Sequence, residues 1–346
     1  MKGNGVASQR RLRVAVIGAG EMGRMHLEGW RTVRDVELVV VADPDLSRAQ
    51  TLASQHGIDC VGDWQAAIDR ADVDVVSVCV PTCFHPDVTV FAAERGKHVI
   101  CEKPIALDLA GADRMIEAAE RNNVHLTIGL MYRASPATPR LREMVQSGAL
   151  GRPVYFSLNA AAGIRPKSLM HAEDGNGGPF IDFAVHLIDW WSVLTGSHVD
   201  WVSAQGCTWA TRAWQHLDRI ERFAVDTGSA LLRFASGDMA DVTLTWGLPH
   251  KAKPSQVSYL NGPKGRVIGS PTGPIEVYLD DAHEPTEVIP TTERTLVAEE
   301  LAVFADALRS GRGPFAPPRE VRQVLAVSLA ILESMRTRQP VAVADV

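Results

Sequence analysis

Three side chains carry groups suited to moving protons and stabilising charge: Lys103, Asp182 and His186. A lysine ammonium can hydrogen-bond a substrate oxygen and stabilise negative charge as it develops there. An imidazole titrates near neutral pH and can exchange a proton with a hydroxyl group. A carboxylate one helical turn earlier can orient that imidazole or hold a substrate hydroxyl. The three groups together indicate proton-transfer chemistry at an alcohol or carbonyl carbon.

Lys103 follows an expected strand over His98–Cys101 and precedes Pro104, which stiffens the turn. In an open parallel sheet, ligands bind beyond the carboxyl ends of the strands, so this position is one where a ligand is expected. Taken alone, however, the pattern is more typical of a solvent-exposed lysine in a loop. A functional interpretation of Lys103 therefore depends on which residues the rest of the chain places beside it.

Asp182, His186 and Asp189 are spaced i, i+4 and i+7 along a helix expected over Phe180–Leu194, so they share one face. The opposite face carries an apolar stripe that can pack beneath a sheet. The glycine-rich entry GNGG lets the backbone approach a ligand closely. The same spacing is also typical of a buried His–Asp pair at a domain interface, and the helix alone leaves both interpretations open.

A glycine-rich turn follows the buried apolar run Val14–Ile17 and opens a helix. Its G-x-G-x-x-G spacing allows a tight turn, a close approach of a pyrophosphate to the backbone, and close packing of helix on strand. The helix N-terminus offers free N–H groups and a positive dipole end to phosphates. The expected cofactor-binding residues of this turn are Gly18, Gly20, Glu21, Met22 and Gly23.

A second apolar run, Val36–Ala42, ends at Asp43, twenty residues after Gly23. An acidic residue at this position can accept both ribose hydroxyls of an adenosine and repels a 2′-phosphate. The order of strand, glycines, helix, strand and acid predicts dinucleotide binding, with NAD favoured over NADP. Arg48 is a candidate 2′-phosphate partner but is more simply a helix surface residue. The alternative is an ordinary tight turn with a solvated aspartate.

The chain divides into two regions of different character. Up to about residue 130, strands and helices alternate, which predicts an α/β doubly wound parallel sheet, a Rossmann domain over 11–132. Several strand-like runs follow one long helix in 133–346, which predicts an α+β domain with an open, largely antiparallel sheet. Residues 1–10 are expected to be a disordered lead-in, and a last helix over about 319–337 is expected to pack back on the first domain.

Composition excludes several classes of function. A net charge of −6 over 346 residues leaves no basic surface for nucleic acid, and no apolar run reaches the roughly 20 residues that span a bilayer. The first residues lack an apolar signal-peptide core. Five cysteines without a C-x-x-C pair indicate reduced thiols in a cytoplasmic protein. Neither H-E-x-x-H nor zinc-type Cys/His spacing occurs, so no metal site is expected.

Five segments in this order resemble the glucose–fructose oxidoreductase/inositol dehydrogenase family (Gfo/Idh/MocA): GAGEMG, ADPD, VCVPTCFHPD, CEKPIAL and GGPFIDFAVHLIDWW. The resemblance covers nearly the whole chain, including the closing helix and tail. It implies that Lys103, Asp182 and His186 are the catalytic lysine, aspartate and histidine. One departure is Phe183, where a small residue usually follows the aspartate.

The resemblance also implies further contacts around the nicotinamide and the substrate. Glu102, Lys103 and the Pro81-Thr82 segment match positions near the nicotinamide, and Tyr132 and Arg133 lie in a segment that touches cofactor and substrate. Two further candidates come from the residues themselves: His85 for the cofactor groove and Arg165 for substrate binding. Lys103, Asp182 and His186 are also expected to contact the substrate.

These observations predict an NAD(P)-dependent oxidoreductase that transfers a hydride between nicotinamide and a secondary alcohol or ketone of a sugar, cyclitol or related polyol. The resemblance implies a homodimer or homotetramer formed through the C-terminal sheet. Two alternatives use the same fold: a glycosidase that oxidises its sugar transiently with bound NAD, and a non-catalytic NAD-binding sensor.

Overall fold

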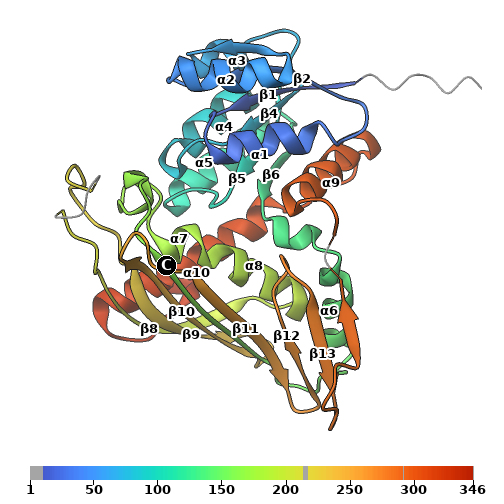
Figure 1. Ribbon diagram of the computed structural model, residues 1–346, viewed down its shortest axis with the longest axis vertical. Helices are drawn as coiled ribbons and strands as arrows, with labels where there is room; N and C mark the ends of the chain where they lie inside the picture. The colour runs from blue at the N-terminus through green and yellow to red at the C-terminus, as the bar shows by residue number, and fades with distance from the viewer. Residues whose placement is uncertain (1–10, 213–216, 291, 346) are drawn as a thin grey trace, which may run out of the picture.

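The computed structural model describes residues 11–212, 217–290 and 292–345, which form two packed lobes (Figure 1). The lead-in expected at 1–10 lies outside the described residues. The first lobe contains a parallel sheet in the order β3-β2-β1-β4-β5-β6. Its strands are β1 (Leu12–Ile17), β2 (Val36–Ala42), β3 (Asp59–Val61), β4 (Val75–Val78), β5 (His98–Glu102) and β6 (Leu126–Gly129). This order confirms the predicted doubly wound Rossmann sheet.

Helices cover both faces of this sheet, which explains why its strands are continuous apolar runs. Val14, Val16 and Val76, on the two central strands, are completely buried. The strand order reverses between β1 and β4, and ligands bind in the crevice that such a reversal opens at the carboxyl ends. The helices are α1 (Glu21–Trp30), α2 (Leu46–His56), α3 (Trp64–Ile68), α4 (His85–Glu94) and α5 (Leu109–Arg121).

A helix from the far end of the chain, α9 (Leu296–Ser310), packs against α1 of the first lobe (Figure 1). Leu301 and Phe304 are completely buried there, and the Phe304 ring meets Trp30 edge to face at 6.4 Å. The two helices approach so closely that a Cβ on Gly29 would lie 2.8 Å from the Leu301 side chain. The first lobe is therefore completed by a segment that the sequence analysis assigned to the second domain.

Replacing Leu301 by alanine is expected to lower the free energy of unfolding by about 3 kcal/mol, because the change removes buried methyl groups and leaves a cavity. The measurement is the midpoint of urea unfolding followed by circular dichroism. Val303→Ala is the matched control, because Val303 lies on the same helix and is 37% exposed. The control should change stability by no more than about 0.5 kcal/mol. Equal effects from the two variants would mean that α9 does not hold the first lobe together.

The second lobe contains a mixed sheet in the order β14-β13-β12-β11-β7-β10-β9-β8-β15. Among the described strands, β7 and β10 form its one parallel pair, and the other pairs are antiparallel. This pairing confirms the predicted, largely antiparallel sheet. Its strands are β7 (Tyr155–Gly163), β8 (Val199–Cys207), β9 (Thr227–Phe234), β10 (Met239–Leu248), β11 (Ser255–Gly262), β12 (Gly265–Ile268), β13 (Ile275–Leu279), β14 (Glu287–Ile289) and β15 (Val341–Ala342).

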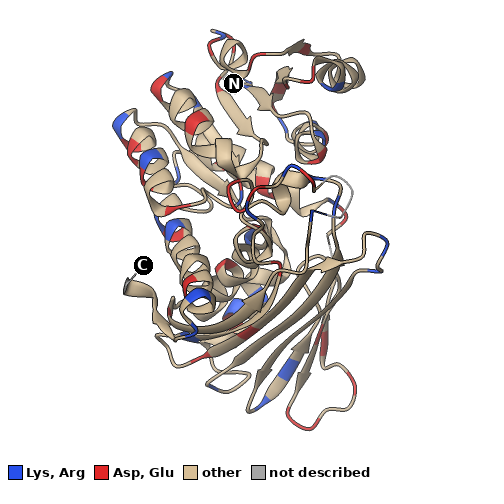
Figure 2. Ribbon diagram, turned by 90° about the vertical axis from the view of Figure 1, so that its left-hand side faces the viewer, with Lys and Arg blue, Asp and Glu red and all other residues tan. Residues whose placement is uncertain are grey.

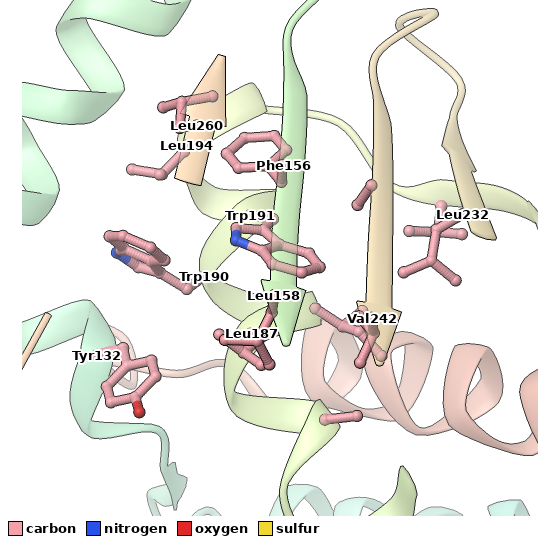
Figure 3. Packing of buried hydrophobic residues seen from close by; sticks show 14 of the residues in the cluster. Tyr132, Phe156, Leu158, Leu187, Trp190, Trp191, Leu194, Leu232, Val242 and Leu260 are labelled. Carbon is pink, nitrogen blue, oxygen red and sulfur yellow. The ribbon is translucent and has the colours of Figure 1, made fainter. Parts of the chain in front are cut away.

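One face of this sheet packs on α6 (Ala137–Gln146), α8 (Ala184–Thr195) and α10 (Pro318–Thr337), as Figure 1 shows. Trp191 of α8 stacks on Phe156 of β7 with ring centroids 5.3 Å apart, at the centre of the apolar cluster in Figure 3. Along the strands, buried residues alternate with outward ones. The outward residues include large apolar side chains that are more than a third exposed: Leu231, Met239 and Val257.

Helix α10 also contacts the first lobe, at α5 and β6. Arg322 pairs with Asp113 of α5, and the Ala316 amide donates to the Thr127 hydroxyl at 3.0 Å. Acidic and basic residues are interspersed over the helices in Figure 2. Within the described ranges, none of the helices combines the length and apolar character needed to cross a bilayer.

Candidate active site

Lys103 and Asp182 join the two lobes. Lys103 comes directly after β5, and its Nζ donates to the Asp182 backbone carbonyl at 2.7 Å and to Asp182 Oδ1 at 3.1 Å. Both side chains are largely buried, with exposed fractions of 16% and 7%. The lysine is therefore held in one position and is not the solvent-exposed loop residue that its sequence alone would favour.

The helix expected over 180–194 is interrupted at Phe183, and this part of the prediction is wrong. Short helix α7 (Pro179–Asp182) ends there and α8 begins at Ala184. In a continuous helix the His186 amide would donate to the Asp182 carbonyl, but it donates to the Phe183 carbonyl at 3.1 Å. The Asp182 carbonyl is thereby free to accept from Lys103 Nζ. The interruption thus has a direct role in joining the two lobes.

Asn176 links Asp182 to the loop that follows β4. Its Nδ2 donates to Asp182 Oδ1 at 3.4 Å, and its Oδ1 accepts from the Thr82 amide at 3.3 Å. The adjacent Gly175 carbonyl accepts from the Cys83 amide at 3.1 Å. The sequence analysis noted the GNGG loop but did not single out this asparagine. The signal available in the sequence was an amide side chain between glycines, in a loop expected to approach a ligand closely.

His186 lies one turn into α8 and is 7% exposed. Its ring is 5.0 Å from the Tyr132 ring, and its Nδ1 is buried without a hydrogen-bond partner among the described residues. Burial, with the nearby Lys103 ammonium as a second cause, holds the pKa of His186 well below its ordinary value. The imidazole is therefore neutral at neutral pH and can accept a proton.

Aromatic rings extend from His186 toward the loop over 164–171. Phe183 is 6.5 Å from the His186 ring and 6.4 Å from Trp246 of β10, measured between centroids. The exposed guanidinium of Arg165 lies 4.7 Å from the Trp246 ring. The predicted substrate residues Tyr132 and Arg165 are thus connected to His186 through ring contacts.

The glycine turn has the shape that a dinucleotide needs. Gly18 has a φ of +103°, and a Cβ there would lie 2.5 Å from the Cys79 carbonyl oxygen. A Cβ on Gly23 would lie 1.8 Å from the Gly18 carbonyl oxygen, so only glycine fits at either position. Gly20, by contrast, has open space around its missing Cβ and begins α1 without a side-chain cap. Its surroundings leave room for a phosphate at the helix N-terminus.

Asp43 follows β2 beside this turn and is 7% exposed. Its Oδ2 accepts from the Ala19 amide at 2.8 Å, and its Oδ1 accepts from the Asp45 amide at 2.9 Å. The carboxylate is therefore fixed at the end of the strand where an adenosine ribose is expected. Arg48 reaches Asp43 Oδ2 at 3.7 Å from an exposed position on α2.

Two predicted cofactor residues lie beneath the loops and not in the crevice. His85 is buried, and its ring nitrogens lie 2.8 Å from the Pro104 carbonyl and 2.9 Å from the Val80 carbonyl. It therefore ties the loop after β4 to the loop after β5. Glu102 is also buried, and its Oε1 lies 2.9 Å from His26 Nε2.

Arg133 and Asp189 form an ion pair with each other. The Arg133 guanidinium binds Asp189 of α8 at 2.6 Å and Glu320 of α10 at 2.9 Å. Both Arg133 and Asp189 line a cavity of about 1170 Å³ between α6, α8 and α10, and neither Lys103 nor His186 lines it. The geometry thus brings Lys103, Asp182 and His186 together and leaves Arg133 and Asp189 in a separate ion-pair cluster.

Two family models match consecutive parts of the chain. Residues 12–130 match the oxidoreductase family with an NAD-binding Rossmann fold, and residues 138–270 match the GFO/IDH/MocA C-terminal domain. The chain belongs to the Gfo/Idh/MocA family. It is therefore an oxidoreductase with an NAD-binding Rossmann domain, as the sequence resemblance implied.

Members of the Gfo/Idh/MocA family resemble this chain over half or nearly all of its length. Myo-inositol 2-dehydrogenase of Thermotoga maritima is 26% identical over 97% of this chain and 99% of its own length. D-glucoside 3-dehydrogenase of Escherichia coli is 39% identical over 51% of this chain and 52% of its own length. A solved structure of levoglucosan dehydrogenase with NADH and levoglucosan shares the fold, with a TM-score of 0.83 at 22% identity, covering 96% of this chain and 100% of that one.

Proposed function

We propose that the protein is an NAD-dependent dehydrogenase that oxidises a secondary alcohol of a sugar, cyclitol or related polyol to the ketone. The observation that carries the proposal is the convergence of Lys103, Asp182 and His186 at the carboxyl end of β5. These residues come from two lobes and from positions up to 83 residues apart. Lys103 and the dinucleotide-binding turn follow parallel strands, so they lie at the same edge of the sheet.

Each of the three side chains has a distinct task in this proposal. Neutral His186 accepts the hydroxyl proton of the substrate at an imidazole nitrogen. The Lys103 ammonium hydrogen-bonds the substrate oxygen and stabilises the negative charge that develops there. Asp182 holds Lys103 Nζ at 3.1 Å and keeps the ammonium aimed into the crevice. Fixed positions contribute rate because the groups need no reorganisation during the reaction.

The residues present fit NAD. Open space at Gly20 and the uncapped N-terminus of α1 suit the pyrophosphate, and Asp43 suits the ribose hydroxyls. Pro81 and Thr82 would line the nicotinamide end, because Asn176 accepts from the Thr82 amide and His85 holds the carbonyl of the preceding Val80. Bound NAD supplies the hydride acceptor, and the protein supplies alignment and electrostatics.

The substrate class follows from the relatives and from the rim of the crevice. The similar proteins carry names of dehydrogenases that act on an inositol, a glucoside and an anhydrosugar. Phe183, the partly exposed ring beside His186, offers an aromatic face on which the C–H face of a sugar ring can stack. Arg165 adds a donor at the outer edge of the same rim.

A screen of NAD⁺ reduction by sugars, inositols and simple glycosides, followed by NADH absorbance, tests this function. The expected result is substrate-dependent formation of NADH with at least one polyol and of a ketone product by mass spectrometry. Cleavage of a glycoside without net NADH, or tight NAD binding without turnover of any polyol, would contradict the proposal.

Asp43→Asn is expected to lower kcat/KM with NAD at least tenfold and to raise kcat/KM with NADP. A hydrogen bond to a charged group is worth about 1.5–3 kcal/mol, and about 1.4 kcal/mol corresponds to tenfold. The negative charge that repels a 2′-phosphate is also lost, while the amide oxygen can still accept a backbone N–H. The measurement is the ratio of kcat/KM for the two cofactors.

Asp45→Asn is the matched control for this prediction. Asp45 lies two residues further on, is 47% exposed in its side chain and caps α2. Removing its charge should leave the NAD-to-NADP ratio unchanged. A wild-type enzyme that already prefers NADP would show that Asp43 does not set the choice of cofactor.

The uncovered face of the second sheet also supports a proposal on assembly. Its exposed apolar residues Leu231, Met239 and Val257 can be buried against a second copy, as a homodimer or homotetramer formed through this sheet.

The cysteines among the described residues are free thiols. Free thiols are typical of the reducing cytoplasm, which we infer to be the location of the protein.

A further inference from the structure

A cluster of three ionisable side chains lies directly behind Lys103. His26 of α1, Glu102 at the end of β5 and Glu300 of α9 have ligand atoms within 4.8 Å of one another. All three are buried, with exposed fractions of 0%, 5% and 1%. Neither carboxyl oxygen of Glu300 has a hydrogen-bond partner among the described residues. Glu300 comes from the far end of the chain and reaches the first lobe because α9 packs on α1.

The hydrogen bonds around His26 assign its protons. Trp30 Nε1 can only donate, so Ser77 Oγ accepts from it at 2.9 Å. The one hydroxyl proton of Ser77 is then free to go to His26 Nδ1, also at 2.9 Å. His26 Nδ1 is thus an acceptor, and His26 Nε2–H donates to Glu102 Oε1 at 2.9 Å. In this arrangement the protons of Trp30, Ser77 and His26 each have a partner, and Glu102 is an acceptor.

The Glu102 carboxylate is well supported. Burial raises its pKa, but the hydrogen bond from His26 and the charges of His26, Lys103 and His85 outweigh burial, so that the pKa of Glu102 lies below its ordinary value. The other titratable groups that face Glu102 and Glu300 from the elements packed around them are His26, Cys79, His85, Cys101 and Lys103. The ammonium of Lys103 is held by Asp182.

Glu300 lacks this support. Burial raises the pKa of Glu300 well above its ordinary value, and the charge of Glu102 raises it further. Two carboxylates that share one buried site cannot both ionise, so one of them keeps a proton. Because His26 donates to Glu102, the proton belongs on Glu300. A protonated carboxyl group also explains how Glu300 can lie unpaired beside a carboxylate.

We propose that Glu300 is a neutral carboxylic acid that keeps Glu102 as the single negative charge behind Lys103. Glu300 is a positioning residue, because it acts on Lys103 through Glu102 and does not reach the crevice itself. The inference rests on the proposed catalytic function of Lys103. Ionisation of Glu300 would add a second negative charge to the buried site, repel Glu102 and move the loop that carries Lys103. Activity should therefore decline at alkaline pH when Glu300 loses its proton.

Infrared spectroscopy of the full-length protein with bound NAD tests the charge of Glu300 directly. At neutral pH the wild type should show the carbonyl stretch of a buried, protonated carboxylic acid, and Glu300→Gln should lack this band. Glu299→Gln is the matched control, because Glu299 is the neighbouring, partly exposed acid of the same helix and accepts from Thr292. The control should keep the band. A wild-type spectrum without the band overturns the proposal, even if the variant does not fold.

Steady-state kinetics test the expected effect of Glu300 on activity. Glutamine keeps a neutral side chain of the same size, so Glu300→Gln should retain kcat/KM within about threefold of wild type at neutral pH. Its alkaline decline should move to higher pH, which a purely structural role would not cause. A loss above about tenfold, or a stoichiometric metal ion that the variant no longer binds, would mean that an ionised Glu300 is needed and would overturn the proposal. The infrared band needs no substrate, so a failure of the proposed function alone leaves the band intact.

Discussion

Lys103→Met should lower kcat by about three orders of magnitude, within the range of about 10²–10⁴ that charge stabilisation and proton transfer supply. Methionine has nearly the same length and no charge, so the crevice keeps its shape while the substrate oxygen loses its donor. The KM for NAD should change little, because the pyrophosphate and ribose are expected at Gly20 and Asp43, on other loops. The measurements are steady-state kinetics and quenching of protein fluorescence by NADH.

Lys97→Met is the control for this variant. Lys97 precedes β5 at the opposite end of the strand, where its Nζ donates to the carbonyls of Arg70 and Val73. Its replacement can affect stability but should leave kcat within about threefold of wild type. Comparable losses from both variants would assign the effect of Lys103 to folding. Near wild-type turnover by Lys103→Met would remove the lysine from the proposed mechanism.

The first lobe could be predicted from the sequence because its requirements are local. Gly18 needs a positive φ, and Gly23 has no room for a Cβ, so the chain must place glycine at both positions. The apolar runs that precede them are continuous because both faces of the sheet are covered. The position of Asp43 at the end of the second strand then follows from the length of one helix and one strand. Each signal is contained within about thirty residues, the size of one βαβ unit.

The interruption of the helix at Phe183 could not be predicted in the same way. Phe183, Leu187 and Trp190 continue the apolar spacing across the break, so the pattern reads as one helix. At the break the Asp182 carbonyl accepts a hydrogen bond from Nζ of Lys103, which lies 79 residues earlier in the chain. A hydrogen bond between distant parts of the chain does not change the spacing of apolar residues in either segment.

Long-range packing also explains the other differences. Arg133 was expected near the cofactor, but acids from α8 and α10 hold its guanidinium, 56 and 187 residues further along the chain. Glu300 was not singled out, because an acid in an amphipathic helix is ordinary until α9 is seen to pack on α1. The resemblance to a family assigned Lys103, Asp182 and His186, whereas spacing alone left their structural interpretations open.

His186→Gln is expected to lower kcat for alcohol oxidation by about 10²–10⁴, the usual contribution of a general base. The pKa of His186 is held well below its ordinary value, chiefly by burial, so the wild-type base is already free at neutral pH. Oxidation should therefore keep its rate as pH falls through 6.5, the ordinary histidine value, and decline only further into the acid range as the ring takes up a proton. The glutamine variant should lack this acid decline.

His98→Gln is the control, because burial also lowers the pKa of His98, yet this residue begins β5 at the end away from the crevice. The control should keep both the rate and the acid decline of the wild type. An unchanged acid decline in His186→Gln would show that another group titrates, and Asp182, 5% exposed and bound to Lys103, would then be the next base to test. A normal rate in His186→Gln would leave the orphaned Nδ1 and the neutral ring without a catalytic role, and the proposed dehydrogenase mechanism would have to be abandoned.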